Sequence, residues 1–414
     1  MNFTKKLLPA LAAVTMIALI AASAFVIRTG SVHAAKDERY KNLELFSEAM
    51  HLIEQNYVEP VENKKLIEGA ISGMLHELDP HSTYLSAEDF NEFKVDTKGE
   101  FGGLGITIGM RDNILTVISP LEDTPAYRKG IKAGDKIIKI EDNSTAGITL
   151  NEAVKKLRGK KGTDVTITIM RDTKDKPFDV TITRDIIKIH SVKHSMIGDD
   201  VGYIRIIQFQ NDVSDEIAAA VTDLRNKGAE GFVIDLRNNP GGLLSEAIKV
   251  SSIFLPANLE VVYTKDRNGR DQHFRSSMLS TKEKEKPLVV LVNEGSASAS
   301  EIFSGAVQDH GRGTLIGKNT YGKASVQTII PIGEGAAMKL TTAKYYTPKG
   351  RMIHETGIKP DVVVEQKDDE MDIQEGEDID PELVSNTAKP KLDLEKDEQL
   401  KAAFDKMREM LGNG

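Results

Sequence analysis

The sequence Phe232-Val-Ile-Asp-Leu-Arg-Asn-Asn-Pro-Gly-Gly242 passes from an apolar run into a polar turn that ends in two glycines. The stretch that follows it, Leu243 to Phe254, is amphipathic. This order predicts a buried strand, a tight turn and a helix. Two other apolar runs, Val201 to Phe209 and Leu288 to Val292, predict further strands. We therefore expect the central part of the chain to form an α/β domain.

A serine-rich segment, Gly295-Ser-Ala-Ser-Ala-Ser-Glu-Ile302, follows the last of these runs. Ser298 is the preferred nucleophile among its serines, because a helix is expected to begin directly after it. Backbone N–H groups are free at the start of a helix, and the helix dipole favours negative charge there. Ser298-x-x-Glu301 is also a capping box, which requires no catalysis. This segment alone leaves both roles open.

A matching base is present in Tyr321-Gly-Lys-Ala-Ser-Val-Gln327. A lysine accepts a serine proton only when it is neutral, and burial favours the neutral form by lowering its pKa. Lys323 stands among small or apolar residues, a context that allows burial. Gln327 follows four positions later, on the same face of a strand or a helical turn, so its amide could orient the amine. The pairing of Ser298 with Lys323 predicts peptide-bond hydrolysis.

Acyl transfer also requires hydrogen-bond donors for the negative charge that develops on the carbonyl oxygen. The N–H of Ala299, together with that of Gly241 or Gly242, could form such an oxyanion hole. The sequence leaves open which glycine donates. It also leaves open whether the two glycines only permit an unusual backbone turn.

The residues around Lys323 also resemble a phosphate-binding loop. Gly317 to Lys323 fits the first seven positions of that motif, but Ala324 stands where a serine or threonine must bind magnesium. The next residues, Ser325 to Ile330, predict a strand where the motif requires a helix. His310 is an alternative base, expected instead to interact with a helix C-terminus. No zinc motif and no cysteine are present, so we predict no metal or organic cofactor.

Upstream, Phe101-Gly-Gly-Leu-Gly-Ile-Thr-Ile108 begins a module that extends to about Arg184 and resembles a PDZ domain. The backbone N–H groups of its carboxylate-binding loop would receive the C-terminal carboxylate of a peptide, which would pair with the adjacent strand edge. That loop would consist of Gly103, Leu104, Gly105 and Ile106. Leu150 to Leu157 would line the peptide groove as a helix. Alternating Val165, Ile167 and Ile169 predict the last strand of the module.

Several segments, taken in order, resemble the carboxyl-terminal processing (tail-specific) peptidases, extracytoplasmic serine proteases with a Ser-Lys dyad and a PDZ domain. The resemblance extends from about Asp37 to about Glu365. The matching segments are Asp235-Leu-Arg-Asn-Asn-Pro-Gly-Gly242, Asn293-Glu-Gly-Ser-Ala-Ser-Ala-Ser-Glu-Ile302, Gly317-Lys-Asn-Thr-Tyr-Gly-Lys-Ala-Ser-Val-Gln327 and Lys344-Tyr-Tyr-Thr-Pro-Lys-Gly-Arg351.

The resemblance implies that Ser298 is the nucleophile, Lys323 the general base and Gln327 its orienter, in a protease core of the crotonase-like type. It also supports the oxyanion-hole pairing. Ala324 and Tyr321 depart from the family, which often has glycine and phenylalanine at these positions. Neither departure removes a functional group.

The N-terminus predicts a targeting segment. Lys5 and Lys6 precede an uncharged, mostly apolar run from Leu7 to Ile27, followed by Arg28. This run is a secretion signal or a membrane anchor, and it is long enough to span a bilayer. Without cysteine, neither a disulfide framework nor a lipoprotein anchor is possible. We expect a protein outside the cytoplasm, either membrane-anchored or secreted, in a bacterial cell envelope.

The overall expectation is a multidomain α+β protein with five parts. These are a signal or anchor (1–36), an N-terminal helical region (37–98), a PDZ domain (99–185), a serine protease core (186–365), and an acidic linker with a C-terminal helix (366–414). Two amphipathic helices in the second part would pack within their own domain or form a homodimer, which the resemblance makes plausible. Leu400, Ala403, Phe404, Met407 and Leu411 mark the final helix, expected to dock on the same chain or a second subunit.

The net charge of −9 and an aromatic content of 5% argue against nucleic-acid binding, which favours a basic face. We expect an endopeptidase that recognises the free C-terminal tails of proteins or peptides through the PDZ domain. It would hydrolyse peptide bonds through an acyl-enzyme. The alternatives are a catalytically silent secreted PDZ scaffold and an esterase or amidase with the same dyad.

Overall fold

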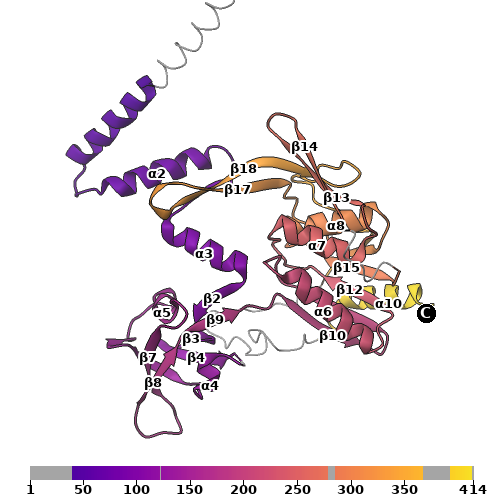
Figure 1. Ribbon diagram of the computed structural model, residues 1–414, viewed down its shortest axis with the longest axis horizontal. Helices are drawn as coiled ribbons and strands as arrows, with labels where there is room; N and C mark the ends of the chain where they lie inside the picture. Colours follow the sequence, from indigo (N-terminus) through magenta and orange to yellow (C-terminus); the bar gives the residue numbers. More distant parts are fainter. Residues whose placement is uncertain (1–39, 122, 278–284, 367–391, 413–414) are drawn as a thin grey trace, which may run out of the picture. The chain divides into compact units, whose positions relative to one another are not determined.

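The computed structural model describes residues 40–121, 123–277, 285–366 and 392–412. The chain divides into two compact units, Met1–Tyr84 and Leu85–Gly414. We describe each unit by itself. A ribbon view gives the order of the elements along the chain (Figure 1).

The described part of the first unit is helical. Residues 40–56 form one helix and α2 (Asn63–His76) another, as the amphipathic spacing predicts. Short strand β1 (Thr83–Leu85) follows at the unit boundary. Among the described residues, no helix is long and apolar enough to cross a membrane. The predicted signal or anchor, Leu7 to Ile27, lies outside the described residues.

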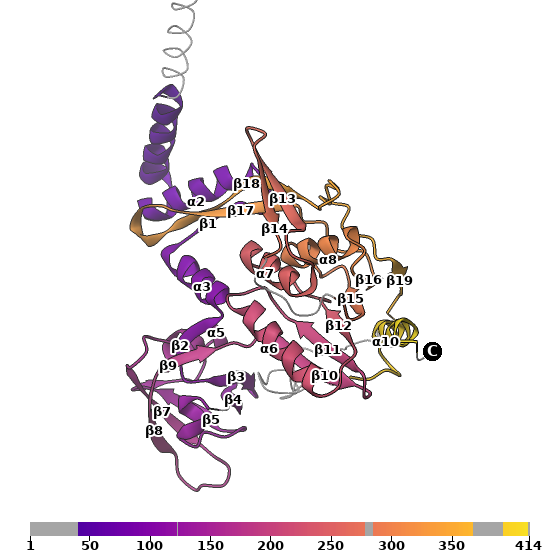
Figure 2. The same ribbon diagram turned by 45° about the vertical axis from the view of Figure 1, so that its right-hand side comes forward.

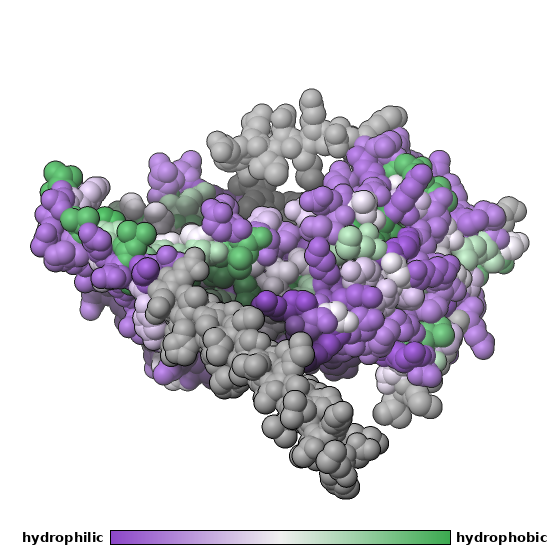
Figure 3. Space-filling model, turned by 90° about the horizontal axis from the view of Figure 1, so that it is seen from above, coloured by the Kyte–Doolittle hydropathy of each residue, from purple (hydrophilic) through white to green (hydrophobic). Residues whose placement is uncertain are grey.

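Large apolar side chains are exposed on the helix of residues 40–56. They are Leu43, Leu45, Phe46, Leu52 and Ile53, each at least 40% exposed. A space-filling view shows hydrophobic residues in separate patches on a mostly hydrophilic face (Figure 3). Several large apolar side chains exposed on one helix are typical of a surface that another element covers.

The second unit begins with α3 (Ala87–Lys98). Ser86 and Asp89 form a capping box at the start of this helix, and Gly99 ends it in the left-handed conformation, with φ of 67°. A PDZ domain follows. Its main sheet has the order β3-β4-β5-β7-β8, with β6 paired to β5, and β2 pairs separately with β9. The strands are β2 (Glu100–Gly103), β3 (Ile106–Arg111), β4 (Ile114–Pro120), β5 (Lys136–Ile140), β6 (Asn143–Ser144), β7 (Asp164–Met170), β8 (Phe178–Thr183) and β9 (Asp185–Lys188), and the helices are α4 (Pro125–Arg128) and α5 (Leu150–Leu157).

The helix predicted to line the peptide groove is present as α5, which packs beside β3. Strand β3 is at one edge of the described sheet, since β4 is its only neighbour in the strand order of these residues. The expectation that Val165 to Ile169 form the last strand was wrong. Strand β8 follows β7 and pairs with it antiparallel, and its own alternating Phe178, Val180 and Ile182 carried the signal.

The domain that the sequence predicts to be a protease core contains a six-stranded sheet in the order β10-β11-β12-β15-β16-β19. Only β10 is antiparallel to its neighbour; the four other pairings are parallel. The strands are β10 (Val192–Ile197), β11 (Val201–Ile206), β12 (Gly231–Asp235), β15 (Leu288–Val292), β16 (Thr314–Gly317) and β19 (Val362–Val363). The predicted strands at β11, β12 and β15 and the predicted helix at α7 (Leu244–Phe254) are confirmed, although β11 ends at Ile206.

Helices cover both faces of this sheet. On β12, Phe232 and Ile234 face α6 (Val213–Asn226), α7 and α8 (Ala299–Asp309), while Val233 faces α10 (Glu398–Met410). The two views in Figures 1 and 2 place α10 on the opposite side of the sheet from α6. Burial on both faces explains why the strands are continuous apolar runs instead of alternating ones. The final helix therefore docks on its own chain.

A second sheet lies beside this core. Strands β17 (Ser325–Pro331) and β18 (Ala337–Tyr346) form a hairpin around a short 3-10 turn (Gly333–Gly335), β18 pairs with β13 (Glu260–Asp266), and β13 pairs with β14 (Asp271–Arg275).

The C-terminal end of α5 is held by Arg184. Its guanidinium donates to the carbonyl oxygens of Lys156 at 2.9 Å and Leu157 at 3.0 Å, which otherwise have no partner within the helix. We predict that Arg184→Met lowers the free energy of unfolding of the PDZ domain by about 2 kcal/mol, the usual range for hydrogen bonds from a charged group. Urea unfolding with hydrogen exchange at α5 measures this. Lys132→Met, at an exposed lysine of the same domain, is the control, and an equal effect of both changes would contradict the prediction.

Candidate active site

The three predicted motif loops follow neighbouring parallel strands. Residues 236–243 follow β12, residues 293–298 follow β15, and residues 318–324 follow β16, and these strands lie side by side in this order. The carboxyl ends of parallel strands meet at one edge of a sheet, which is where ligands bind in open α/β folds. The sheet topology therefore brings the candidate nucleophile, base and oxyanion residues to one edge.

Ser298 stands at the turn between β15 and α8. Its backbone has φ of 53° and ψ of −112°, a strained conformation for a residue other than glycine. The neighbouring Ser296 and Ser300 are fully buried, and their hydroxyls donate to the carbonyl oxygens of Leu236 (2.8 Å) and Asn239 (3.0 Å). Ser298 is only half-buried. Of these three serines, it is the one that a substrate can reach.

The turn after β12 forms hydrogen bonds with residues on both sides of Ser298. The carbonyl oxygen of Asn239 accepts from the N–H of Ala297 at 3.0 Å as well as from the Ser300 hydroxyl. Asn239 is itself fully buried, and its side-chain amide donates to the carbonyl oxygen of Ile206 at 2.7 Å. The position of Ser298 thus depends on the Asn-Asn-Pro-Gly-Gly turn.

The two glycines of this turn differ in their hydrogen bonds. A Cβ on Gly241 would lie 2.8 Å from the Cβ of Ser298 and 2.8 Å from the nitrogen of Ala299, so this backbone approaches the nucleophile closely. The N–H of Gly241 donates to the Asn239 side-chain oxygen at 2.9 Å. No hydrogen bond among the described residues uses the N–H of Gly242 or of Ala299. These two donors are the ones left for a ligand.

Glu301 connects the two halves of the candidate dyad. Its carboxylate accepts from the N–H of Ser298 (2.9 Å) and, 19 to 22 residues further along the chain, from the Thr320 hydroxyl (2.6 Å), the N–H of Gly322 (2.7 Å) and the N–H of Lys323 (2.9 Å). The side chain is fully buried. Burial raises the pKa of Glu301, while the four hydrogen bonds act in the opposite direction. The capping interaction expected from the sequence is therefore part of a cross-link between the nucleophile and the lysine loop.

Tyr345, on β18, joins the same two segments. Its hydroxyl donates to the carbonyl oxygen of Ser298 at 3.3 Å and to that of Lys323. Its backbone N–H donates to the carbonyl oxygen of Ala324. Burial, reinforced by the negative charge of Glu301, raises the pKa of Tyr345 well above its ordinary value, so the phenol stays protonated as a donor. Sequence analysis missed both roles, because nothing in local spacing links positions 298, 323 and 345.

Lys323 is half-buried and lies two residues before the start of β17. The strand there confirms the sequence argument against a phosphate-binding loop, which requires a helix. The side-chain nitrogen of Gln327 donates to the hydroxyls of Ser325 at 2.7 Å and Thr341 at 3.4 Å. The register of β17 against β18 shifts between Val326 and Gln327, whose partners are Ala343 and Thr341, so the extra residue of this irregularity is Thr342 in β18.

His310 lies at the other end of α8 from Ser298, 12 residues further along the chain, which is about 18 Å along the helix axis at about 1.5 Å per residue. Its Nε2 donates to the carbonyl oxygen of Glu260, on β13, at 2.6 Å. This histidine holds a strand to a helix end and is too far along α8 to serve Ser298 as a base. The structure thus removes the alternative base that the sequence left open.

Three family models match the chain. Peptidase family S41 matches residues 200–364, a PDZ domain model matches residues 102–182, and the N-terminal domain of the activating protease CtpB matches residues 18–89. The S41 segment contains every residue of the candidate site.

Two curated bacterial proteins are similar over most of their length. A carboxy-terminal-processing protease of Bartonella bacilliformis is 47% identical over 351 residues, which cover 84% of this chain and 80% of that protein. The carboxy-terminal processing protease CtpB of Bacillus subtilis is 38% identical over 81% of this chain and 70% of its own. The solved structure of a photosystem II D1 C-terminal processing protease matches with a TM-score of 0.46 and 26% identity, covering 78% of this chain and 92% of that one.

The cross-link through Glu301 predicts the effect of Glu301→Gln. The carboxylate accepts four hydrogen bonds with its two oxygens. A glutamine amide replaces one of these oxygens by an N–H₂ group, which is itself a donor, so at least one of the four donors loses its acceptor, at a cost of about 1–3 kcal/mol of stability. Peptide cleavage should fall with it, because the nucleophile and the lysine loop lose their common anchor. Thermal unfolding and kcat measure the two effects.

Glu246→Gln is the matched control. Glu246 is also buried, but it accepts from the N–H of Ser214 and from Lys249 and contacts neither candidate segment in these bonds. The Glu246→Gln variant should lose stability while keeping most of the wild-type kcat. A Glu301→Gln enzyme with the kcat of wild type would refute the cross-link as a determinant of the site.

The turn predicts a second sensitive position. Gly242 has φ of +142°, and a Cβ there would lie 2.2 Å from the carbonyl oxygen of Phe209. Gly242→Ala must therefore shift the turn, and we expect kcat to fall by about 100-fold, the scale of one misplaced oxyanion donor. Gly269→Ala, in an open hairpin turn with φ of +73°, adds only backbone strain and should leave kcat unchanged. Similar kcat values for the two variants would contradict this prediction.

Proposed function

Because this chain belongs to peptidase family S41, as a carboxy-terminal processing serine protease with a PDZ domain, we propose that Ser298 is its nucleophile and Lys323 its general base. The observation that carries the proposal is the Glu301 carboxylate. It binds the N–H of Ser298 and the N–H of Lys323, each at 2.9 Å, and so holds the backbones of both residues against one side chain. The strained turn at Ser298 and the half-buried position of Lys323 support this assignment.

In the proposed reaction, the Ser298 oxygen attacks the scissile carbonyl carbon while its proton passes to the neutral Lys323 amine. The N–H groups of Ala299 and Gly242 bind the resulting oxyanion, a choice supported by the commitment of the Gly241 N–H to Asn239. The tetrahedral intermediate then expels the amine, which takes the proton from Lys323, and leaves an acyl-enzyme. Water that loses its proton to Lys323 hydrolyses this ester and restores Ser298. Gln327 would orient the lysine amine.

Substrates of this protease are proteins or peptides. We assign recognition of their free C-terminal tails to Gly103, Leu104, Gly105 and Ile106. The carbonyl oxygens of Leu104 and Gly105 accept from Ala126 and Leu121, both at 2.9 Å, while no hydrogen bond among the described residues uses the N–H of Leu104 or Gly105. Two backbone donors beside the edge strand β3 suit a terminal carboxylate.

The remaining assignments follow from the sequence. We propose that the protein acts outside the cytoplasm, directed there and anchored by Leu7 to Ile27. The exposed apolar side chains of residues 40–56 would form a homodimer contact. The five-part division, with boundaries after residues 36, 98, 185 and 365, stands as part of this proposal.

The test is cleavage of an unfolded protein with an apolar C-terminal tail, by the chain from Asp37 onward. Ser298→Ala and Lys323→Ala should each lower kcat by about 10⁴-fold or more, as losses of a nucleophile or base do, and retain binding of the tail. Ser304→Ala and Lys318→Ala are the matched controls, since the buried Ser304 hydroxyl, further along α8, has no hydrogen-bond partner among the described residues, and Lys318 pairs with Glu294 and Glu365. These controls should keep kcat within a few-fold of wild type.

Other results separate the alternatives. Tail binding without cleavage by the wild type would favour the silent scaffold. Hydrolysis of esters but not of peptides would favour an esterase. Cleavage that persists in both Ser298→Ala and Lys323→Ala would overturn the assignment of the site.

A further inference from the structure

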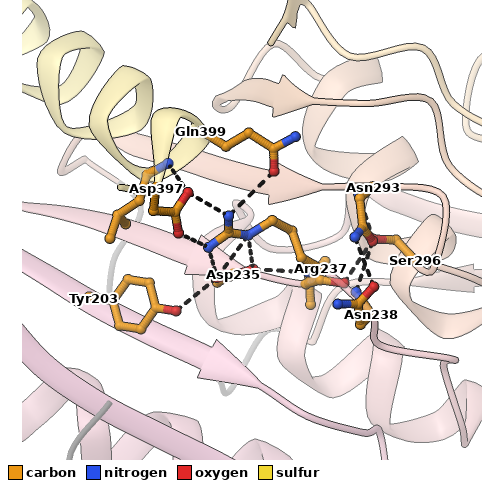
Figure 4. Close-up of polar contacts among 10 residues, drawn as sticks. Tyr203, Asp235, Arg237, Asn238, Asn293, Ser296, Asp397 and Gln399 are labelled. Carbon is orange, nitrogen blue, oxygen red and sulfur yellow. Dashed lines mark hydrogen bonds and ion pairs between the residues drawn. The ribbon is translucent and has the colours of Figure 1, made fainter. Parts of the chain in front are cut away.

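A buried arginine follows β12, at the start of the loop that leads to Gly242. The Arg237 guanidinium forms a bidentate pair with Asp235, with nitrogen-oxygen distances of 2.7 to 3.1 Å (Figure 4). Asp235 is fully buried and also accepts from the Tyr203 hydroxyl at 2.8 Å. Burial acts to raise the pKa of Asp235, but the charge and hydrogen bonds of Arg237 outweigh it and hold that pKa below its usual value.

The other side of the same guanidinium is bound by the C-terminal helix. Both carboxylate oxygens of Asp397 accept from Arg237 at 2.8 Å, and the side-chain oxygen of Gln399 accepts at 3.3 Å (Figure 4). These residues are 160 and 162 positions away in the sequence. They lie beyond residue 364, where the match to the S41 family model ends. A segment outside the matched protease core therefore accepts three of the six hydrogen bonds that this guanidinium donates.

The two acceptors are held rigidly. Asp397 is the N-cap of α10 and accepts from the N–H of Leu400 at 2.9 Å, while the Gln399 amide donates to the carbonyl oxygen of Val364 at 2.9 Å. Leu400, Ala403 and Met407 bury the apolar face of α10 on the sheet. The carboxylate that meets Arg237 therefore has little freedom to follow the arginine if the arginine moves.

The arginine leads directly into the turn that supports Ser298. The next residue, Asn238, exchanges two hydrogen bonds of 2.8 Å with the Asn293 side chain, at the start of the serine segment. Asn239 then binds the residues on both sides of Ser298, and Gly242 follows. A displacement of Arg237 is transmitted along these bonds to the nucleophile and to the proposed oxyanion donors.

We propose that Asp397 and Gln399 are positioning residues for catalysis, which set the oxyanion turn of residues 238–242 through their hydrogen bonds to Arg237. This inference rests on the proposed function of Ser298 and Gly242. It adds the C-terminal helix to the parts of the chain that determine the rate of acyl transfer. The helix touches no substrate in this role, and it acts only through the arginine.

The experiment compares Asp397→Asn and Asp397→Ala in the chain from Asp37 onward. The asparagine keeps the size of the side chain and one acceptor, and the alanine removes both acceptors. We expect kcat to fall by about 10-fold for Asn and about 100-fold for Ala, the range that a displacement of about 1 Å produces, with KM within two-fold of wild type. Hydrogen exchange at residues 236–243 should become faster in the same order.

Two variants on the same helix separate positioning from stability. Met407→Ala removes a fully buried docking side chain far from Arg237, and should lower the Tm with little change in kcat measured well below it. Glu409→Gln removes an exposed ion pair with Lys406 and should change neither quantity. The proposal fails if kcat of the Asp397 variants equals that of wild type, or if kcat and Tm fall together in the same proportion for Asp397→Asn and Met407→Ala.

Ser298→Ala distinguishes failure of this inference from failure of the proposed function. If wild type and Ser298→Ala have equal activity, the serine assignment is wrong, and the hydrogen-exchange comparison alone decides the role of Asp397. Unchanged exchange at residues 236–243 in Asp397→Ala would then overturn the inference as well.

Discussion

The buried carboxylate of Glu301 is the interaction on which the candidate site depends. It sits at the N-terminal end of α8, where the helix dipole favours a negative charge, and it satisfies four donors that come from two separate segments. A buried carboxylate is costly unless its oxygens are fully hydrogen-bonded, and each donor in turn would be costly without the carboxylate. The two segments therefore stabilise each other only when both are in place. Tyr345 also joins them, through hydrogen bonds from its hydroxyl to the carbonyl oxygens of Ser298 and Lys323.

The rest of the core supplies the frame in which this cross-link works. A mostly parallel sheet with helices on both faces brings together, at one edge, three loops that are separated in the sequence. The strands fix where the three loops begin. The unusual backbone conformations are in the loops themselves, at Ser298 with φ of 53° and at Gly242 with φ of 142°. Strain of this kind persists only where surrounding bonds over-determine the backbone, as the hydrogen bonds of Asn239 do here.

Much of this could be read from local patterns, and the limits have physical reasons. Apolar runs located β12 and β15 because strands buried on both faces need no alternation. The preference for Ser298 rested on an expected helix start, which α8 provides. The cross-links of Glu301 and Tyr345, by contrast, join residues 19 to 47 positions apart, and no spacing rule predicts which buried donor meets which acceptor. The irregularity in β18 shows the same limit, since one extra residue, Thr342, changes the face of the later side chains of that strand and leaves no mark in composition.

The packing of α10 has a consequence for how the protein is made. The helix covers apolar residues of β11, β12, β15 and β16, all of which precede it in the chain. During synthesis, the sheet is therefore complete while one of its faces is still open to water, until residues 398–410 have also left the ribosome. That interval exposes the side chains of Val201, Val233 and Val289 to other hydrophobic surfaces. In a growing chain, this apolar face of the sheet is therefore covered only after the C-terminal helix has docked.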